Sequence, residues 1–200
     1  ASRADYNGTD QLQISVSDGT ATVSNQIVNL TLTPVADIAA NTVSTAEDTA
    51  VTIPVLTNDS FESAARQITH INGLSITAGG AAIAVPNGAV TLTASGDLVF
   101  TPAANYNGPA TFNYTVTAGG VAETAAGRVT VTPVNDAPLA VNDRTSTAGN
   151  TSLSLTPATL LGNDTDIDGN TLTITSVQNP VGGTVALVGG NVVFTPTVGF

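Results

Sequence analysis

The segment GNDTDIDGN, residues 162–170, places Asp164, Asp166 and Asp168 at every second position and follows them with Gly169. Only 10% of the residues in the chain are charged, so this concentration of carboxylates stands apart from the rest of the sequence. Carboxylates this close repel one another unless a divalent cation or several backbone N–H groups compensate their charge. Two interpretations fit the segment: a turn that binds a hard cation, and an exposed acidic turn that binds nothing.

The spacing of these aspartates matches the first six positions of an EF-hand calcium loop. A complete EF-hand loop needs a bidentate glutamate at its twelfth position, and Thr175 stands there, in a stretch that alternates like a strand. We therefore expect no EF-hand. Oxygen ligands without a neighbouring His or Cys still favour Ca²⁺ over a transition metal, so the segment predicts a calcium loop.

A second group of oxygen-bearing side chains lies in VNDAP, residues 134–138, where Asn135 and Asp136 precede the stiffening Pro138. The equivalent stretch VADIA keeps Asp37 but has alanine in place of the asparagine. An ordinary linker is also rich in Asn, Asp and Pro, so this pattern alone fits both a ligand set and a plain connection.

Composition excludes several classes of function. The net charge is −11, with 15 acidic and 4 basic residues, and there is no cysteine. A nucleic acid or an anionic membrane requires a basic surface, so neither is an expected partner. No apolar run is long enough for membrane insertion, and the chain can form neither a disulfide nor a thiolate metal site. The charge favours cations as partners.

The sequence repeats with a period of about 100 residues. Tyr6 and Tyr106 of two YNG elements lie 100 residues apart, and two TPV elements lie 99 residues apart. We expect residues 1–35 to form the last hairpin of a first repeat, and residues 36–134 a complete middle repeat. Residues 135–200 are then the N-terminal strands of an incomplete third repeat.

Apolar residues alternate with polar ones in LQISV, TFNYTV and TLTIT, which predicts half-buried antiparallel strands. Turn dipeptides such as Asp18-Gly19 and Asn87-Gly88 recur between these stretches. About seven short strands per repeat indicate an all-β fold of tandem Greek-key β-sandwiches, cadherin-like or immunoglobulin-like. On this pattern the third repeat contains the first five of those strands.

On these motifs the chain resembles the cadherin-like tandem repeats of very large bacterial surface adhesins, the calcium-dependent repeats-in-toxin (RTX) type. The resemblance lies in the segments GNDTDIDGNTLTITSV, VVFTP, YNGTD and VNDAP and covers essentially the whole chain. It implies an extracellular, non-enzymatic extender module on the bacterial cell surface. Calcium at the repeat junctions stiffens such a fibre, which serves cell adhesion and biofilm formation.

The resemblance also implies a set of calcium ligands. At the second junction these are Asn135, Asp136, Asp164, Asp166 and Asp168. At the first junction Asp37, Glu47 and Asp59 are weaker matches. The segment TNDSFES replaces the three-aspartate loop in the middle repeat, so Asn58, Asp59 and Glu62 are its remaining oxygen donors. The partners implied are neighbouring repeats or identical chains placed head to tail, and the adhesive target stays open.

The sequence predicts no enzyme. His70 is the one histidine, and no serine–acid pair, phosphate loop or HExxH motif accompanies it. A lone histidine beside a turn is more often structural than catalytic. A glycan- or cell-binding module ranks behind a structural one, because the chain has 3 tyrosines and no tryptophan to stack on sugars.

The partial repeats at the two ends allow two interpretations. In the first, the chain is a window on a longer tandem array, whose flanking strands complete each partial repeat. In the second, the hairpin of one chain completes the third repeat of the next, and the contact builds a filament because it does not close on itself. Both interpretations lead to a surface fibre, and the first is the usual setting of such repeats.

Overall fold

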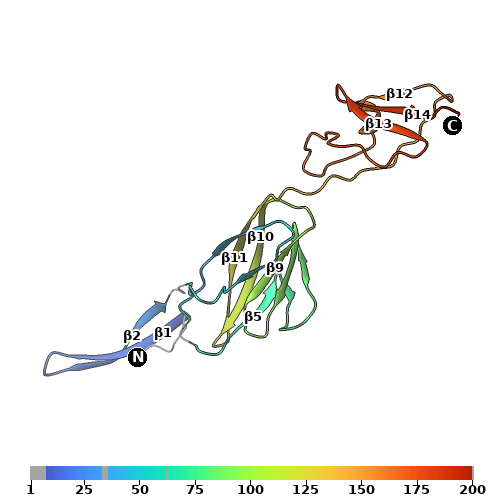
Figure 1. The fold of residues 1–200 in the computed structure, drawn as a ribbon. Coiled ribbons are helices and arrows are strands. Elements are labelled where there is room, and N and C mark those ends of the chain that lie inside the picture. The colour runs from blue at the N-terminus through green and yellow to red at the C-terminus, as the bar shows by residue number, and fades with distance from the viewer. Residues whose placement is uncertain (1–7, 33–35, 62, 200) are drawn as a thin grey trace. The chain divides into compact units, whose positions relative to one another are not determined.

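Strands make up most of the regular structure. The structure is a computed structural model that describes residues 8–32, 36–61 and 63–199 (Figure 1). In this part of the chain the single helix, α1, has four residues, Pro157–Leu160, and the Thr156 side chain caps it by accepting from the N–H of Thr159. The prediction of an all-β fold is confirmed.

The first two strands form a hairpin that is a two-stranded sheet of its own. Strands β1 (Gly8–Ser17) and β2 (Thr22–Leu32) are antiparallel. Asp18 closes the turn between them, because its Oδ1 accepts from the N–H of Thr20 at 2.9 Å and from the N–H of Ala21 at 2.7 Å. Such a side-chain-to-backbone bridge is the reason that Asp is favoured in turns.

Residues 41–132 fold into two packed sheets, the β-sandwich of the middle repeat (Figure 1). One sheet has the order β3-β11-β10-β5-β6, with the bounds Asn41–Ala46, Val121–Thr132, Gly108–Ala118, Arg66–Ile71 and Leu74–Ser75. The other has the order β4-β9-β8-β7, with the bounds Val51–Ile53, Leu98–Pro102, Gly88–Leu92 and Ile83–Val85. Neighbouring strands are antiparallel except for the parallel pair β3 and β11.

The core lies between these sheets, where alternate side chains of β10 point inward. Phe112, Tyr114 and Val116 are buried there, and burying such side chains stabilises a fold by about 1.5–3 kcal/mol each. Phe112 stacks on Phe100 of β9, with ring centroids 6.2 Å apart and planes 9° apart. Gly127 of β11 faces Phe112, and a Cβ there would lie 2.5 Å from the ring, so this close approach requires glycine.

Residues 134–200 form a second unit built around three strands. These are β12 (Leu153–Leu155), β13 (Gly183–Val188) and β14 (Asn191–Pro196), in the order β12-β14-β13. The register repeats that of β4-β9-β8, because Gly183 pairs with Pro196 as Gly88 pairs with Pro102. The second unit therefore contains the smaller sheet of a sandwich.

The prediction of five strands in this unit was wrong. TLTIT, residues 171–175, lies in no strand, although Leu172 and Ile174 alternate with exposed threonines and are half-buried. In the middle repeat the equivalent strand β5 pairs with β10. The described part of the second unit has no counterpart of β10, so the backbone of this segment lacks the ladder that would make it a strand.

Candidate functional site

The linker VNDAP and the aspartate loop lie against each other within the second unit. Leu139 and Thr165 form an antiparallel bridge, in which the N–H of Leu139 donates to the Thr165 carbonyl at 2.8 Å. The N–H of Thr165 donates back to the Leu139 carbonyl at 3.0 Å. Two segments that carry the sequence-predicted ligands are thus fastened side by side by their backbones.

Backbone N–H groups engage each of the three loop aspartates. Asp164 Oδ1 accepts from the N–H of Val141 at 2.7 Å, which ties the loop to the linker. Asp166 Oδ1 accepts from the N–H of Asp168 at 3.0 Å and from the N–H of Asn170 at 3.1 Å. These N–H donors point at the carboxylates and offset part of their mutual repulsion.

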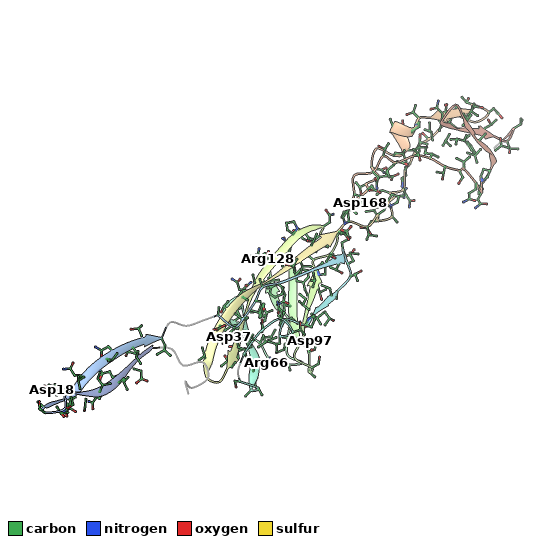
Figure 2. The ribbon with its side chains drawn as sticks, turned by 90° about the vertical axis from the view of Figure 1, so that its left-hand side faces the viewer. Asp18, Asp37, Arg66, Asp97, Arg128 and Asp168 are labelled. Carbon is green, nitrogen blue, oxygen red and sulfur yellow. The ribbon has the colours of Figure 1, made fainter. Side chains whose placement is uncertain are left out.

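Asp168 completes the connection to the linker. Its Oδ2 accepts from the N–H of Asp136 at 2.7 Å, and a carboxylate oxygen of Asp136 lies within 4.8 Å of one of Asp168. Asp168 is labelled in Figure 2. Asn170 Nδ2 donates to Asn135 Oδ1 at 2.7 Å beside them. Asn170 was missed by the sequence analysis, and its position directly after the Asp-Gly turn was the available signal.

This arrangement leaves oxygen atoms for a cation. Among the described residues, Oδ2 of Asp164, Oδ2 of Asp166 and Oδ1 of Asp168 accept no hydrogen bond. Carboxylate and amide oxygens are the ligands that Ca²⁺ prefers, and Asn135 and Asp136 add to that donor set. The residues present therefore fit a calcium ion in chemical type.

The middle repeat uses its Asn-Asp pair in the same way. Asp59 Oδ1 accepts from the N–H of Ala39 at 2.9 Å, as Asp164 does from Val141. Asp59 Oδ2 is buried and has no hydrogen-bond partner in the described structure. Burial raises the pKa of the Asp59 carboxyl, the N–H of Ala39 and the charge of Arg66 oppose that rise, and the charge of Glu123 adds to it.

Asp37 lies at the same end of the sandwich as Asp59. Its carbonyl accepts from the N–H of Ser60 at 2.9 Å. Glu123 of β11 holds this segment, because its Oε2 accepts from the N–H of Asp37 at 2.8 Å and of Ile38 at 3.1 Å. The sequence analysis missed Glu123, and its only signal was that it is the one acid of β11, whose other charged residue is Arg128.

The expectation that Glu47 joins Asp37 and Asp59 at the first junction needs correction. Glu47 follows β3, and its N–H donates to the carbonyl of Thr132 at the far end of β11. At about 3.3 Å per residue, the two ends of β3 lie about 17 Å apart. These acids therefore lie at opposite ends of the sandwich and cannot share one ion. Glu62, the other acid expected near Asp59, lies outside the described residues.

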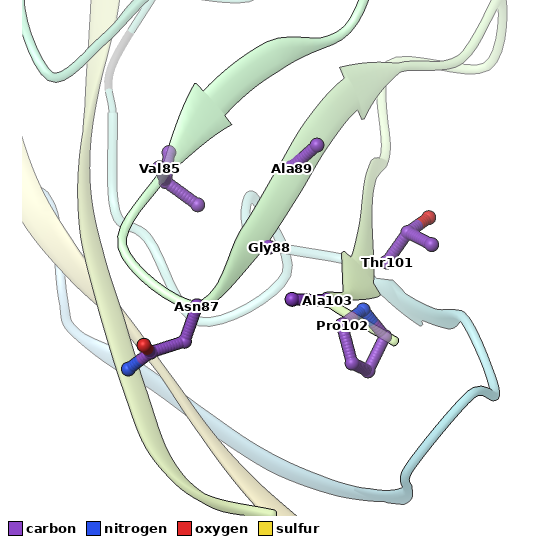
Figure 3. A pocket seen from close by; sticks show the side chains of 7 residues that line it. All are labelled: Val85, Asn87, Gly88, Ala89, Thr101, Pro102 and Ala103. Carbon is purple, nitrogen blue, oxygen red and sulfur yellow. The ribbon is translucent and has the colours of Figure 1, made fainter. Parts of the chain in front are cut away.

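His70 and the pocket in Figure 3 both lie in the middle repeat. His70 lies in β5, where its Nδ1 is 3.0 Å from Thr69 Oγ1, so its neighbour is a hydroxyl and not a nucleophile–acid pair. The pocket, of about 520 Å³, lies at the ends of β7, β8 and β9. Seven residues line it, none of them titratable: Val85, Asn87, Gly88, Ala89, Thr101, Pro102 and Ala103.

Tyr106 occupies a corner between strands. Its hydroxyl donates to the carbonyl of Pro109 at 2.6 Å and accepts from Asn87 Nδ2 at 2.9 Å. Tyr106 is therefore half-buried at this corner, with its hydroxyl hydrogen-bonded to two neighbours. Tyr6, its repeat mate, lies outside the described residues.

A family comparison agrees with the sandwich and its tandem repetition. The sequence model described as "Bacterial Ig domain" matches residues 33–132 and again residues 135–200, together more than half of the chain. The chain therefore belongs to the bacterial Ig domain family. Domains of this family are typically extracellular or on the cell surface. No curated protein matches the chain.

Several solved structures are similar to the chain at low identity. They include an endo-fucoidan hydrolase of glycoside hydrolase family 107 (17% identity, 96% of this chain and 30% of that chain, TM-score 0.34). A structure on Dscam isoform specificity matches at 11% identity, over 95% of this chain and 52% of that chain, with a TM-score of 0.33. The titin domains z1z2 in complex with telethonin match at 12% identity, over 82% of this chain and 80% of that chain, with a TM-score of 0.28.

The chain spans 30% of the hydrolase that it matches. Across the residues that the structure describes, no helix has both the length and the apolar character needed to cross a membrane.

Proposed function

We propose that the chain is a non-enzymatic structural segment of a bacterial surface adhesin or fibre, in which calcium holds the linker of a repeat to its aspartate loop. The family and its tandem repetition support a structural module. The pocket without titratable groups and the hydroxyl environment of His70 give catalysis no support.

The observation that carries the calcium part is the pair Asp136 and Asp168. Their carboxylates approach within 4.8 Å, while a 2.7 Å hydrogen bond joins the backbone of one to the side chain of the other. Two carboxylates at that separation favour a bound cation, because it removes their mutual repulsion. Asn135, Asp136, Asp164, Asp166 and Asp168 would hold the ion, and a divalent charge would neutralise them while fixing the linker.

The setting fits this role. A cysteine-free chain with a net charge of −11 has no disulfide to stiffen it. Extracellular calcium is millimolar, and a ligand that binds only the folded state stabilises it by about 2.7 kcal/mol at a concentration of 100 Kd. Within the middle sandwich, Asp37, Asp59 and Glu123 offer a second, smaller set of oxygens.

Thermal unfolding tests the proposal. The midpoint for the second unit is measured in millimolar calcium, in the same concentration of magnesium, and with chelator. We expect calcium to raise the midpoint more than magnesium, because Mg²⁺ demands a stricter octahedral site. Asp168→Asn should reduce the calcium effect, whereas Asp143→Asn, an exposed acid outside both segments, should retain it. An unfolding midpoint that is the same in calcium and in chelator would contradict the calcium role.

A further inference from the structure

Strand β3 opens the middle sandwich and β11 closes it, and these two strands lie side by side in parallel. Asn41 stands opposite Gly127, and Ala46 stands opposite Thr132. The pairing continues just beyond β3, because the N–H of Glu47 donates to the carbonyl of Thr132 at 2.9 Å. The first and last strands of the repeat are therefore fastened directly to each other.

The segment that precedes β3 follows the same strand. Oε2 of Glu123, in β11, accepts from the N–H of Asp37 at 2.8 Å. These two residues are 86 apart in sequence, as are the paired residues at the start of β3. Residues 37–46 thus follow residues 123–132 in one register, and we call these two segments the terminal clamp.

Side chains reinforce the terminal clamp. Thr132 Oγ1 donates to the carbonyl of Thr45 at 3.2 Å, across the strand pair. Asn41 Nδ2 donates to the hydroxyl of Tyr114 at 2.8 Å, and that hydroxyl donates to the carbonyl of Ala39 at 2.8 Å. Because Tyr114 is buried, the start of β3 is attached to the core as well as to β11.

The parallel direction of the pair decides how the repeat responds to tension. The chain enters the clamp at residue 37 and leaves it at residue 132, and in a parallel pair these points lie at opposite ends. A pull on them slides the two segments past each other and loads their hydrogen bonds together. In an antiparallel hairpin the chain enters and leaves at the same end, so a pull opens the bonds one after another. Bonds that must break together resist a larger force than bonds that break in turn.

We propose that the terminal clamp is a mechanical element, which keeps the middle repeat folded when the chain is stretched from its two ends. The proposal rests on the proposed function only for the premise of a structural segment under tension. It does not require calcium, because the bonds of the clamp join protein groups within the middle repeat. Forced unfolding is governed by the rate of unfolding, so the clamp acts on a property that equilibrium stability does not report.

Single-molecule stretching of the full chain tests the proposal, and the absence of cysteine allows handles at chosen positions. Ala40→Cys with Pro133→Cys places the handles at opposite ends of the β3–β11 pair. Thr49→Cys with Pro133→Cys places both at one end, because the N–H of Thr49 donates to the carbonyl of Ala46 at the end of β3. All three positions are exposed. We expect an unfolding force several-fold higher for the opposite-end handles.

A matched pair of variants tests the hydrogen bonds of the clamp. Successive N–H groups of a strand point to opposite sides, so the N–H of Thr45 faces β11, as that of Glu47 does, and the N–H of Ser44 faces away. Strand β3 is an edge strand, so proline at position 44 removes no bond of the sheet. With opposite-end handles, Thr45→Pro should lower the unfolding force far more than Ser44→Pro.

The stretching is done with calcium and with chelator, so that its outcome is separate from that of the calcium site in the second unit. A higher force for the opposite-end handles that persists with chelator supports the clamp. Equal forces for the two pairs of handles, or equal losses in the two proline variants, would overturn the proposal. If Thr45→Pro does not fold, the two pairs of handles still decide the question.

Discussion

The backbone N–H of Asp136 donates to Oδ2 of Asp168 at 2.7 Å, across 32 residues of sequence. This bond joins the VNDAP linker to the aspartate loop within one unit, beside the backbone bridge of Leu139 and Thr165. Asp164 and Asp168 therefore have a structural role whether or not an ion is bound, which is to accept from the N–H groups of Val141 and Asp136. Calcium would add to an arrangement that the backbone already favours.

Replacing Asp168 should loosen the linker. Asp168→Ala removes the acceptor for the N–H of Asp136, and a hydrogen bond of this kind contributes about 0.5–1.5 kcal/mol. We expect faster hydrogen exchange at the amide of Asp136 and unchanged exchange in β10. Asp143→Ala, at an exposed position, is the matched control. Equal exchange at Asp136 in both variants would show that the bond contributes nothing.

Asp59→Asn should stabilise the middle sandwich at neutral pH without calcium. The variant retains an oxygen for the N–H of Ala39 and removes a charge at the buried, unpartnered Oδ2. Burial raises the folded-state pKa of Asp59. The contribution of Asp59 to the free energy of unfolding is therefore favourable at low pH and is lost as the pH rises through that pKa. The gain from Asp59→Asn, measured by urea unfolding, should therefore shrink on acidification, and a constant or negative gain would contradict this.

Asp18 should titrate at low pH. Hydrogen bonds from the backbone of Ala21 and Thr20, and from the Thr20 hydroxyl, lower the pKa of Asp18 to about 2. Because the pKa of Asp18 is lower in the folded chain than in the unfolded chain, its carboxylate stabilises the turn at pH values above the unfolded pKa. This contribution is lost as the pH falls toward 2. Carboxyl NMR of the chain should show this titration, and a value near 3.8 would mean that the turn does not hold the side chain.

Tyr114→Phe should destabilise the sandwich. The buried hydroxyl donates to the carbonyl of Ala39 at 2.8 Å and accepts from Asn41 Nδ2 at 2.8 Å. Its loss removes both hydrogen bonds, although Asn41 Nδ2 still donates to the carbonyls of Ala39 and Val55, so we expect a cost of about 0.5–1.5 kcal/mol in the free energy of unfolding. Urea unfolding measures it, and Tyr106→Phe at the half-buried corner should cost less, because water can replace its partner. Equal losses would contradict the role assigned to burial.

The contribution of Tyr114 to stability should also depend on pH at high pH. Burial, followed by the charge of Asp59, raises the pKa of Tyr114 to about 12, while the hydrogen bond from Asn41 opposes the rise. Its contribution to stability is complete below the unfolded value near 10 and is lost as the pH rises toward 12.

The sequence was sufficient for the class of fold because strand alternation and turn residues are local signals. LQISV and TFNYTV lie in β1 and β10, and the Asp18-Gly19 turn joins β1 to β2. TLTIT has the same alternation and forms no strand, because a strand also needs a partner backbone, which no local pattern supplies. The lack of a pairing strand, and not the strand propensity of its residues, explains why TLTIT is not a strand.

Less of the candidate site than of the fold could be predicted from the sequence. The spacing of Asp164, Asp166 and Asp168 was enough to predict that they lie close together, because they share one turn. It could not show that Glu47 lies at the end of the sandwich opposite Asp59, because that depends on the direction of β3 in the sheet. Nor could it find Glu123, whose partners lie more than 80 residues away in sequence. Contacts set by the fold, in contrast to those within a turn, require the structure.

The central claim, that calcium binds where the linker meets the aspartate loop, is tested most directly by amide NMR of the chain during a calcium titration. The account predicts saturable shifts confined to residues 135–141 and 164–170, and their loss in Asp168→Asn. If millimolar calcium leaves these amides unchanged, the backbone N–H groups alone compensate the aspartates, and the loop is an acidic turn without an ion.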